Sequence, residues 1–318
     1  MGLFPSAAAA WRVSEEGFWK DNAIGNVVNN FKLRVGYGTT GNCNIDNYMY
    51  ATAYNATVYP VGNQETAALA PGSTVGNNNL KWEKTVSTNI GLDLGLWGNR
   101  VNLTLDWYNN KSDDLLMKVA IPTSTGYTHQ YQNIGSIRNQ GLDLMLSTRN
   151  IDTKDFTWTT SINANFNKNK ILSLGDNDED ILKNEWVSGA SILRVGESVG
   201  SFYGYKRLGV YTIEDYEAGN CQKKQIGRAK RSSEREIIGK GVPDWTGSMI
   251  NTLRYKNWDF TLDLQFVAGV QTLQQFYHST YDRFGQTNGL TNILYDAYNG
   301  TNPNSMQQAI WLFNGGHA

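Results

Sequence analysis

Hydrophobic and polar residues alternate one by one along several stretches of this chain. The longest such stretch covers residues 84–108 and is interrupted only at residues 97–100. A period of two over this length indicates β-strands with one apolar face. Gly98 and Asn99 tolerate the positive φ angles that a tight turn needs. The pattern therefore predicts a β-hairpin that turns at these two residues.

The register of this hairpin can be predicted from the same residues. A two-residue loop at Gly98 and Asn99 places each apolar residue of one strand opposite an apolar residue of the other. The expected pairs are Leu96 with Val101, Leu94 with Leu103, Leu92 with Leu105, and Ile90 with Trp107. A shift of one residue would scatter these partners over both faces. Turn chemistry and hydrophobic pattern therefore favour one register.

Other alternating stretches predict more strands of this kind. Two more hairpins are expected at 141–148 with 156–167 and at 249–255 with 258–266, single strands at 31–37 and 115–121, and a weaker strand at 201–211. Long polar segments between them are expected to be loops, at 38–81, 123–139, 174–200 and 212–242. The strands are near the roughly 9–11 residues that a tilted membrane crossing requires. Short turns at one end and long loops at the other are typical of an outer-membrane β-barrel.

A soluble β-sandwich also has alternating strands, but three features favour the membrane barrel. The predicted strands exceed the usual length of about five or six residues. The face opposite the apolar one carries mainly Asn, Thr, Ser, Gly and Asp, which suits a water-filled lumen. Aromatic residues lie near the strand ends on the apolar face, where a barrel has its interfacial girdles. The expected girdle residues are Trp107, Phe156, Trp158, Phe166, Tyr255 and Trp258.

Composition agrees with this interpretation and excludes some classes of protein. Hydrophobic residues make up 40% of the 318 residues, and the mean hydropathy is −0.47. The sequence has no apolar run of about 18 residues, which a membrane helix needs. The net charge of −1 gives no reason to expect a nucleic-acid partner. Cys43 and Cys221 lie far apart in loop-like sequence, and we expect them to be unlinked thiols.

The sequence gives no sign of catalysis. Its three histidines, His129, His278 and His317, do not have the spacing of a zinc pair. It contains no Walker loop. We therefore expect neither an enzyme nor a bound cofactor or metal.

Short motifs along the chain carry a family resemblance. Among them are Leu3-Phe4-Pro5-Ser6, Asn79-Leu80-Lys81-Trp82-Glu83, Asn89-Ile90-Gly91-Leu92-Asp93, Arg138-Asn139-Gln140-Gly141, Val195-Gly196-Glu197-Ser198-Val199-Gly200 and Tyr255-Lys256-Asn257-Trp258-Asp259. In combination, from the first residues to about Gly269, they resemble the SusC/RagA family of TonB-dependent outer-membrane receptors. One segment departs from the family. Many relatives have an acidic loop where this chain has the basic residues 228–236, which we interpret as a solvated charged loop without a cation site.

The resemblance implies an all-β fold, a transmembrane antiparallel β-barrel of about 22 strands that follows a plug domain. It assigns residues 1–269 to a partial barrel domain with long extracellular loops, and 270–318 to a loop-like tail of the same barrel. The family's plug, TonB-binding segment and closing strands have no counterpart in this sequence. We therefore expect a fragment from the C-terminal half of such a receptor, with roughly ten strands.

The resemblance also implies a function in the outer membrane, which the chain would cross many times. That function is the import of glycan oligosaccharides. The implied partners are a SusD-like lipoprotein and the TonB complex, which would act through a plug domain. Outer-membrane lipid would surround the barrel. Peptide import of the RagA type, a non-transporting receptor or adhesin, and an inactive truncated product remain alternatives. Aromatic faces suit sugar rings. Loop aromatics that could contact substrate, or simply pack within the loops, are Tyr127, Tyr131 and Trp186.

Overall fold

The computed structural model describes residues 2–175, 177–183, 189–274, 290–291 and 293–299. The chain divides into two compact units. The first contains residues 1–181, 193–199 and 242–269, and the second contains 182–192, 200–241 and 270–318. The predicted contact residue Trp186 and most of the predicted tail lie outside the described residues. Within the described part of the chain, no helix has the length and apolar character needed to cross a membrane.

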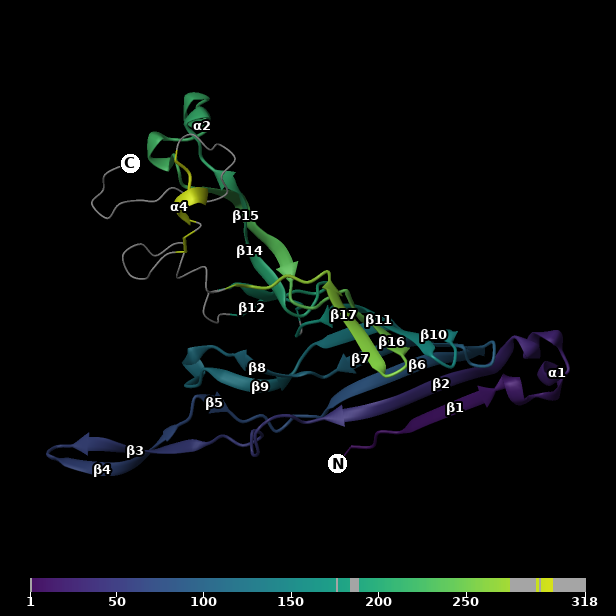
Figure 1. The fold of residues 1–318 in the computed structure, drawn as a ribbon. Coiled ribbons are helices and arrows are strands. Elements are labelled where there is room, and N and C mark those ends of the chain that lie inside the picture. The colour runs from purple at the N-terminus through teal and green to yellow at the C-terminus, as the bar shows by residue number, and fades with distance from the viewer. Residues whose placement is uncertain (1, 176, 184–188, 275–289, 292, 300–318) are drawn as a thin grey trace. The chain divides into compact units, whose positions relative to one another are not determined.

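The first unit is built on an antiparallel sheet of eight strands in the order β1-β2-β6-β7-β10-β11-β16-β17 (Figure 1). The strands are β1 (Ser6–Arg12), β2 (Val28–Asn42), β6 (Glu83–Leu96), β7 (Val101–Asp113), β10 (Ser136–Asp152), β11 (Phe156–Ser173), β16 (Trp245–Tyr255) and β17 (Trp258–Ala268). The order follows the chain, so the sheet is an up-and-down meander. The three predicted hairpins and the strand at 31–37 are confirmed, and β10 and β11 extend well beyond their predicted ends because polar residues continue the ladder.

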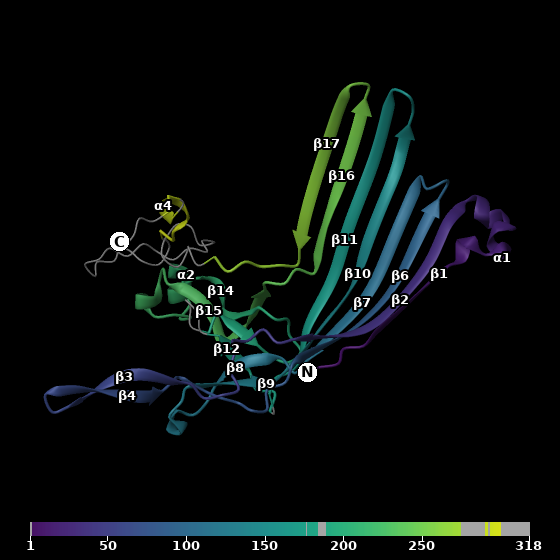
Figure 2. The same ribbon diagram turned by 90° about the horizontal axis from the view of Figure 1, so that it is seen from below.

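Short connections gather at one end of this sheet and long ones at the other (Figure 2). The hairpins turn at residues 97–100, 153–155 and 256–257, whereas residues 43–82, 114–135 and 174–244 form the long connections. The connection between β1 and β2 lies at the short-turn end and carries η1 (Val13–Glu15), α1 (Gly17–Lys20) and η2 (Ala23–Asn26). Trp19 of α1 anchors it to β2, with its ring centroid 5.0 Å from that of Phe31.

The β6–β7 hairpin has the predicted register, and all four expected apolar pairs are present. Its turn is the predicted one, since Arg100 N donates to Trp97 O at 3.4 Å and both Gly98 and Asn99 have positive φ. Trp97 also has a positive φ, of 52°. Trp97 N donates to the carbonyl of Val27, the residue just before β2, at 2.8 Å. The ladder between β6 and β7 ends at the pair of Leu96 and Val101.

Rows of paired residues give the sheet one apolar face. From β1 to β17 one row reads Ala9, Val35, Ile90, Trp107, Leu142, Phe166, Trp245 and Ala268. The next row on this face reads Trp11, Leu33, Leu92, Leu105, Leu144, Ala164, Gly247 and Phe266. Side chains alternate along each strand, so the residues between them form a second, mainly polar face. The apolar face is open, with Val35 52% and Trp258 79% exposed.

The apolar band crosses the paired rows obliquely. At the long-loop end of β2 the band reaches Tyr37, but from β6 to β11 the same row is polar: Thr88, Asn109, Gln140 and Lys168. At the short-turn end of β17 the band reaches Trp258, in a row with Tyr255 and Phe156. The band therefore shifts toward the turns from β2 to β17. Strands that are tilted relative to a flat apolar layer produce such a stagger.

Two smaller sheets of the first unit occupy long connections. The segment 38–81, predicted as a loop, contains the hairpin β3 (Tyr54–Val61) and β4 (Gln64–Pro71). Beyond it, β5 (Thr74–Val75), β9 (His129–Asn133) and β8 (Leu116–Ala120) form a three-stranded sheet, and η3 (Thr123–Thr125) precedes β9. The strand predicted at 115–121 is therefore confirmed, but it pairs in this small sheet and not in the large one.

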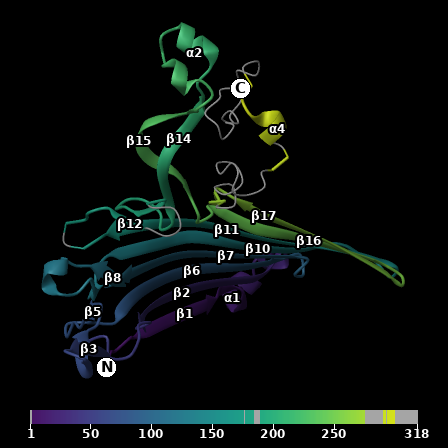
Figure 3. The same ribbon diagram turned by 90° about the vertical axis from the view of Figure 1, so that its left-hand side faces the viewer.

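A further sheet has the order β12-β13-β14-β15, with β12 (Ile181–Lys183), β13 (Ser191–Leu193), β14 (Ser201–Val210) and β15 (Ala229–Lys240). The helices α2 (Ile213–Glu217), η4 (Lys223–Gln225) and α4 (Ile293–Asp296) belong to the second unit. The weak strand predicted at 201–211 is confirmed as β14, which pairs with β15 (Figure 3).

The interpretation of residues 228–236 as a solvated loop is wrong. They form most of β15, because the backbone pairs with β14 and the basic side chains lie over tyrosine rings.

Candidate functional site: the polar face of the sheet

An ion-pair network spans three strands on the polar face. Arg34 of β2 donates through Nε and Nη2 to the two carboxylate oxygens of Asp93 in β6, at 2.9 and 3.0 Å. Its Nη2 also donates to Oδ2 of Asp106 in β7 at 3.0 Å. Thr104 Oγ1 adds a hydrogen bond to Asp93 Oδ1 at 3.1 Å. One guanidinium thus neutralises two carboxylates that would otherwise repel each other.

Gly91 makes this network possible. It lies in the row between Arg34 and Asp106, as their partner in β6. A Cβ atom at Gly91 would overlap the Asp106 carboxylate and the Arg34 guanidinium. The missing side chain lets Arg34 reach across a whole strand, which explains a glycine in the middle of β6 despite its low preference for strands.

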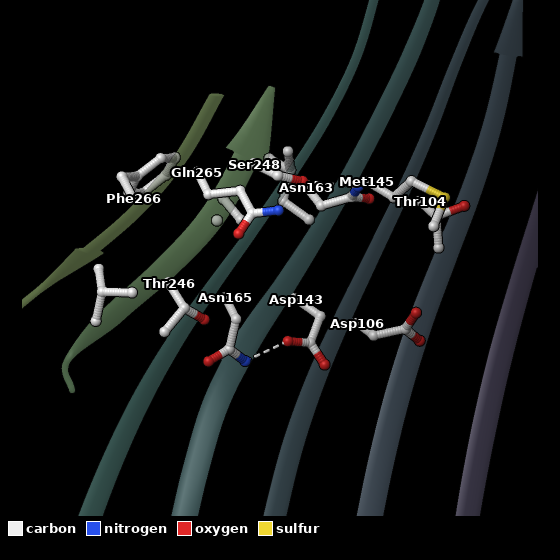
Figure 4. Close-up of a pocket in the computed structure, with 14 residues that line it drawn as sticks. Thr104, Asp106, Asp143, Met145, Asn163, Asn165, Thr246, Ser248, Gln265 and Phe266 are labelled. Carbon is white, nitrogen blue, oxygen red and sulfur yellow. Dashed lines mark hydrogen bonds between the residues drawn. The ribbon is translucent and has the colours of Figure 1, made fainter. Parts of the chain in front are cut away.

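A shallow hollow of about 570 Å³ lies beside this network (Figure 4). Its polar lining comes from β7, β10, β11, β16 and β17: Thr104, Asp106, Asp143, Asn163, Asn165, Thr246, Ser248 and Gln265. A side-chain hydrogen bond from Asn165 Nδ2 to Asp143 links two of these strands, as the dashed line in Figure 4 marks. The lining offers amide, hydroxyl and carboxylate groups, which can exchange hydrogen bonds with water or with a polar solute.

A second hollow of about 550 Å³ continues the polar face toward the long loops. It shares Asp106, Asp143 and Asn165 with the first, and Tyr108 also lines it. Tyr108 Oη donates to Asn167 Oδ1 at 3.0 Å and accepts from Asn165 Nδ2 at 3.3 Å. In the described part of the chain, no three His, Cys, Asp or Glu residues are grouped so as to hold a metal ion. The chemistry of this face is hydrogen bonding and charge.

The six predicted girdle residues fall into two groups on the apolar face. Trp107 and Phe166 share a row with Trp245, which the prediction omitted and whose ring centroid is 4.8 Å from that of Phe166. The other four lie at the short-turn end: Phe156, Tyr255 and Trp258 in one row, and Trp158 in the next. Their contact with a membrane stays a prediction.

The predicted substrate contacts Tyr127 and Tyr131 belong to the small sheet of β5, β9 and β8. Tyr127 precedes β9, where partial desolvation, with a hydrogen bond and charge repulsion from Tyr54, raises the pKa of its phenol. Tyr131 lies in β9 opposite Lys118, and its carbonyl accepts from Asn77 Nδ2 at 2.9 Å. Both residues are partly buried against their own loop neighbours.

The residues of the polar face were missed as site candidates in the sequence. Arg34 and Asp93 are 59 residues apart, and they meet only because β2 pairs with β6 across a long connection. The sequence did carry one signal for this site: in their alternating strands, Arg34, Asp93 and Asp106 occupy the polar positions, opposite the apolar face.

The family model described as TonB dependent receptor-like, beta-barrel matches residues 1–314. Among curated proteins, TonB-dependent receptor P3 of Formosa agariphila is 36% identical over 288 residues, which are 85% of this chain and 28% of that protein. TonB-dependent receptor SusC of Bacteroides thetaiotaomicron is 36% identical over 279 residues, covering 83% of this chain and 27% of that protein. The chain spans less than a third of the length of these two relatives.

Solved structures of similar fold include the RagAB peptide transporter, with a TM-score of 0.76 and 23% identity over 96% of this chain and 34% of that chain. The RagAB peptide importer in the 'open-open' state has a TM-score of 0.74 at 23% identity, over 99% of this chain and 34% of that chain. The expected barrel fold and the SusC/RagA resemblance are confirmed by these matches.

Proposed function

Since this chain belongs to the TonB-dependent receptor β-barrel family, we propose that its eight-stranded sheet is a section of barrel wall in an outer-membrane importer. The observation that carries the proposal is the two-faced sheet. Continuous apolar rows of a kind that water-soluble proteins bury lie exposed on one face. Ion pairs and hydrogen-bonding groups cover the other. Lipid contacts the first face and a wet lumen borders the second.

The two sets of aromatic residues on the apolar face mark where the sheet meets the two membrane–water interfaces. In this proposal Trp107 and Phe166 lie near one interface, and Phe156, Trp158, Tyr255 and Trp258 lie near the other. Indole and phenol rings favour the headgroup level because they combine an apolar body with a polar end. The short turns then face the periplasm and the long connections face the exterior.

The substrate that we propose is a glycan oligosaccharide, taken up with a SusD-like lipoprotein and driven by the TonB complex through a plug domain. The similarity to the protein named SusC supports this choice. The hydrogen-bonding side chains of the polar face suit hydroxyl-rich solutes. Import of peptides is the second candidate, because the structural neighbours are named as a peptide transporter.

Uptake by living cells tests the proposal. We expect that deletion of the gene for the receptor containing this chain abolishes uptake of one class of fluorescent oligosaccharide and leaves peptide uptake unchanged. Re-expression of the receptor is the control and should restore uptake. Loss of peptide uptake alone would favour the second candidate. Unchanged uptake of every solute would point to a non-transporting receptor or adhesin.

A further inference from the structure

The ribbon of β14 and β15 is basic, unlike the chain as a whole. Residues 201–240 contain nine Lys or Arg and five Asp or Glu, in a chain whose net charge is −1. The paired strands and the turn between them therefore form a local positive field, which attracts anions at low ionic strength.

Two arginines of the ribbon face each other. Arg207 of β14 is the direct register partner of Arg231 in β15, and both residues are exposed. Like charges directly opposite each other destabilise a strand pair. Among the residues that the structure describes, neither guanidinium has an ion-pair partner. The unfavourable pair becomes favourable when an anion lies between the two groups.

A bulge in β15 creates this juxtaposition. Tyr205 pairs with Arg235, but the next pair is Arg207 with Arg231, so the register shifts between them. Lys206 N donates to Ser232 Oγ at 3.0 Å, which stabilises the extra residues of β15. Bulges turn side chains to positions that regular pairing does not allow. Without this one, Arg231 would not lie opposite Arg207.

Tyrosine rings order the arginines on the same face of the ribbon. The Cζ atom of Arg231 lies 4.4 Å from the ring centroid of Tyr205. Arg235 lies over Tyr203 at 4.9 Å and donates to the carbonyls of Tyr203 and Gly189, so its hydrogen-bonding capacity is partly used within the fold. A guanidinium held against a ring keeps its N–H groups at the edge free for a planar oxyanion.

We propose that Arg207 and Arg231, with Tyr205 beside them, bind a carboxylate or sulfate group of an acidic oligosaccharide. Each guanidinium can donate two parallel hydrogen bonds to such a group, and the tyrosine ring can contact the sugar that carries it. This inference rests on the proposed import of oligosaccharides and narrows the substrate to those with uronate or sulfate groups.

Calorimetric titration of the receptor that contains this chain, in detergent micelles, tests the inference. The ligands are a tetrasaccharide of galacturonate, its fully methyl-esterified form and a sulfated galactose tetrasaccharide. We expect at least one of the charged forms to bind about tenfold or more tighter than the ester, since charge-assisted pairs contribute more than neutral ones. Preference for the uronate or for the sulfated sugar identifies the oxyanion.

Variants distinguish binding by the two arginines from attraction by the overall positive charge of the ribbon. The double variant R207Q/R231Q should lose the preference for charged sugar. K206Q should keep it within about twofold, because Lys206 lies between Tyr205 and Arg207 and thus on the other face of β14. In the unsubstituted receptor, high salt should weaken binding of the charged sugar and not of the ester. This measurement uses no variant, so its result does not depend on whether a variant folds.

Equal affinity for the charged sugars and the ester would overturn this inference and leave the proposed import intact. An absence of binding to all three saccharides would overturn this inference, and the uptake experiment with other oligosaccharides decides separately on the proposed function. Tighter binding of a glutamate-rich hexapeptide than of any charged sugar, lost in R207Q/R231Q, would overturn the assignment to a saccharide. Loss of the preference in K206Q as strong as in R207Q/R231Q would reduce the site to nonspecific charge.

Discussion

At the scale of single residues, Arg34 and Gly91 show how the polar face is held together. The guanidinium of Arg34 contacts carboxylates on two other strands, and Gly91 leaves the space through which it reaches the second. All three charged side chains are about one-fifth to one-third exposed. At such partial burial an unpaired carboxylate loses some of its hydration without gaining a partner, so the network contributes to stability.

Substitution of Arg34 tests this contribution. We expect Arg34→Gln to lower the free energy of unfolding of the complete receptor by about 1–2 kcal/mol, because Asp93 and Asp106 then repel each other without a cation between them. Lys32→Gln is the matched control, since it removes the same charge from the same face of β2. Lys32 lies opposite Asp93 in the register but forms no ion pair in the described structure, so its loss should cost less than about 0.5 kcal/mol. Denaturant unfolding in micelles measures both. Equal losses would show that the ion pairs contribute nothing specific.

At the scale of elements, β17 shows the two faces most clearly. Trp258, Phe260, Leu262, Leu264 and Phe266 lie on the apolar face, and every one of them is exposed in the described structure. The residues between them lie on the polar face. A strand with this pattern is stable at the surface of the sheet only if the exterior is itself apolar, as lipid is.

Neighbouring substitutions in β17 separate the two faces. Leu262→Arg should lower the stability of the receptor in lipid bilayers by about 2–4 kcal/mol, because it places a charge among acyl chains. Thr261→Arg, one residue away on the polar face, should change it by less than about 1 kcal/mol. Reversible unfolding in bilayers compares the two variants. A larger loss for Thr261→Arg would mean that the faces have been assigned the wrong way round.

At the scale of the whole molecule, the described sheet has two edges. Each of β1 and β17 has one neighbour in the large sheet, so among the described strands one side of each leaves its backbone donors and acceptors unpaired. Hydrocarbon does not hydrogen-bond to such groups, and barrels avoid the cost by closing. The wall described here therefore requires further strands beside it in a membrane.

The behaviour of the 318-residue chain alone follows from these edges. Expressed without any further sequence and refolded into detergent, it should aggregate and show no heat-modifiable band on gels, because its two edges pair with other chains. The complete receptor, treated in the same way, is the control and should show the shift. A detergent-stable monomer of the 318-residue chain would contradict the need for further strands.

The sequence by itself determined the strands of the three hairpins in the large sheet, their two faces and the register of the β6–β7 hairpin. The alternation at 84–108 and the pair Gly98 and Asn99 predicted the register of β6 with β7, and every predicted pair is present. These features depend on local rules: side chains alternate along a strand, and only some residues accept positive φ. The same rules indicated that one face is apolar and the other polar.

Only the tertiary structure decided which distant residues meet. The pairing of β2 with β6 and of β11 with β16 joins Arg34 to Asp93 and Phe166 to Trp245 across long connections whose sequence does not set a register. The charged segment 228–236 had no alternating pattern that predicted a strand, and its place in β15 depends on the partner strand and the tyrosines beneath its arginines. Contacts of this kind are fixed when the sheet assembles, because register across a long loop is set by packing and hydrogen bonding between strands and not by the residues of the loop.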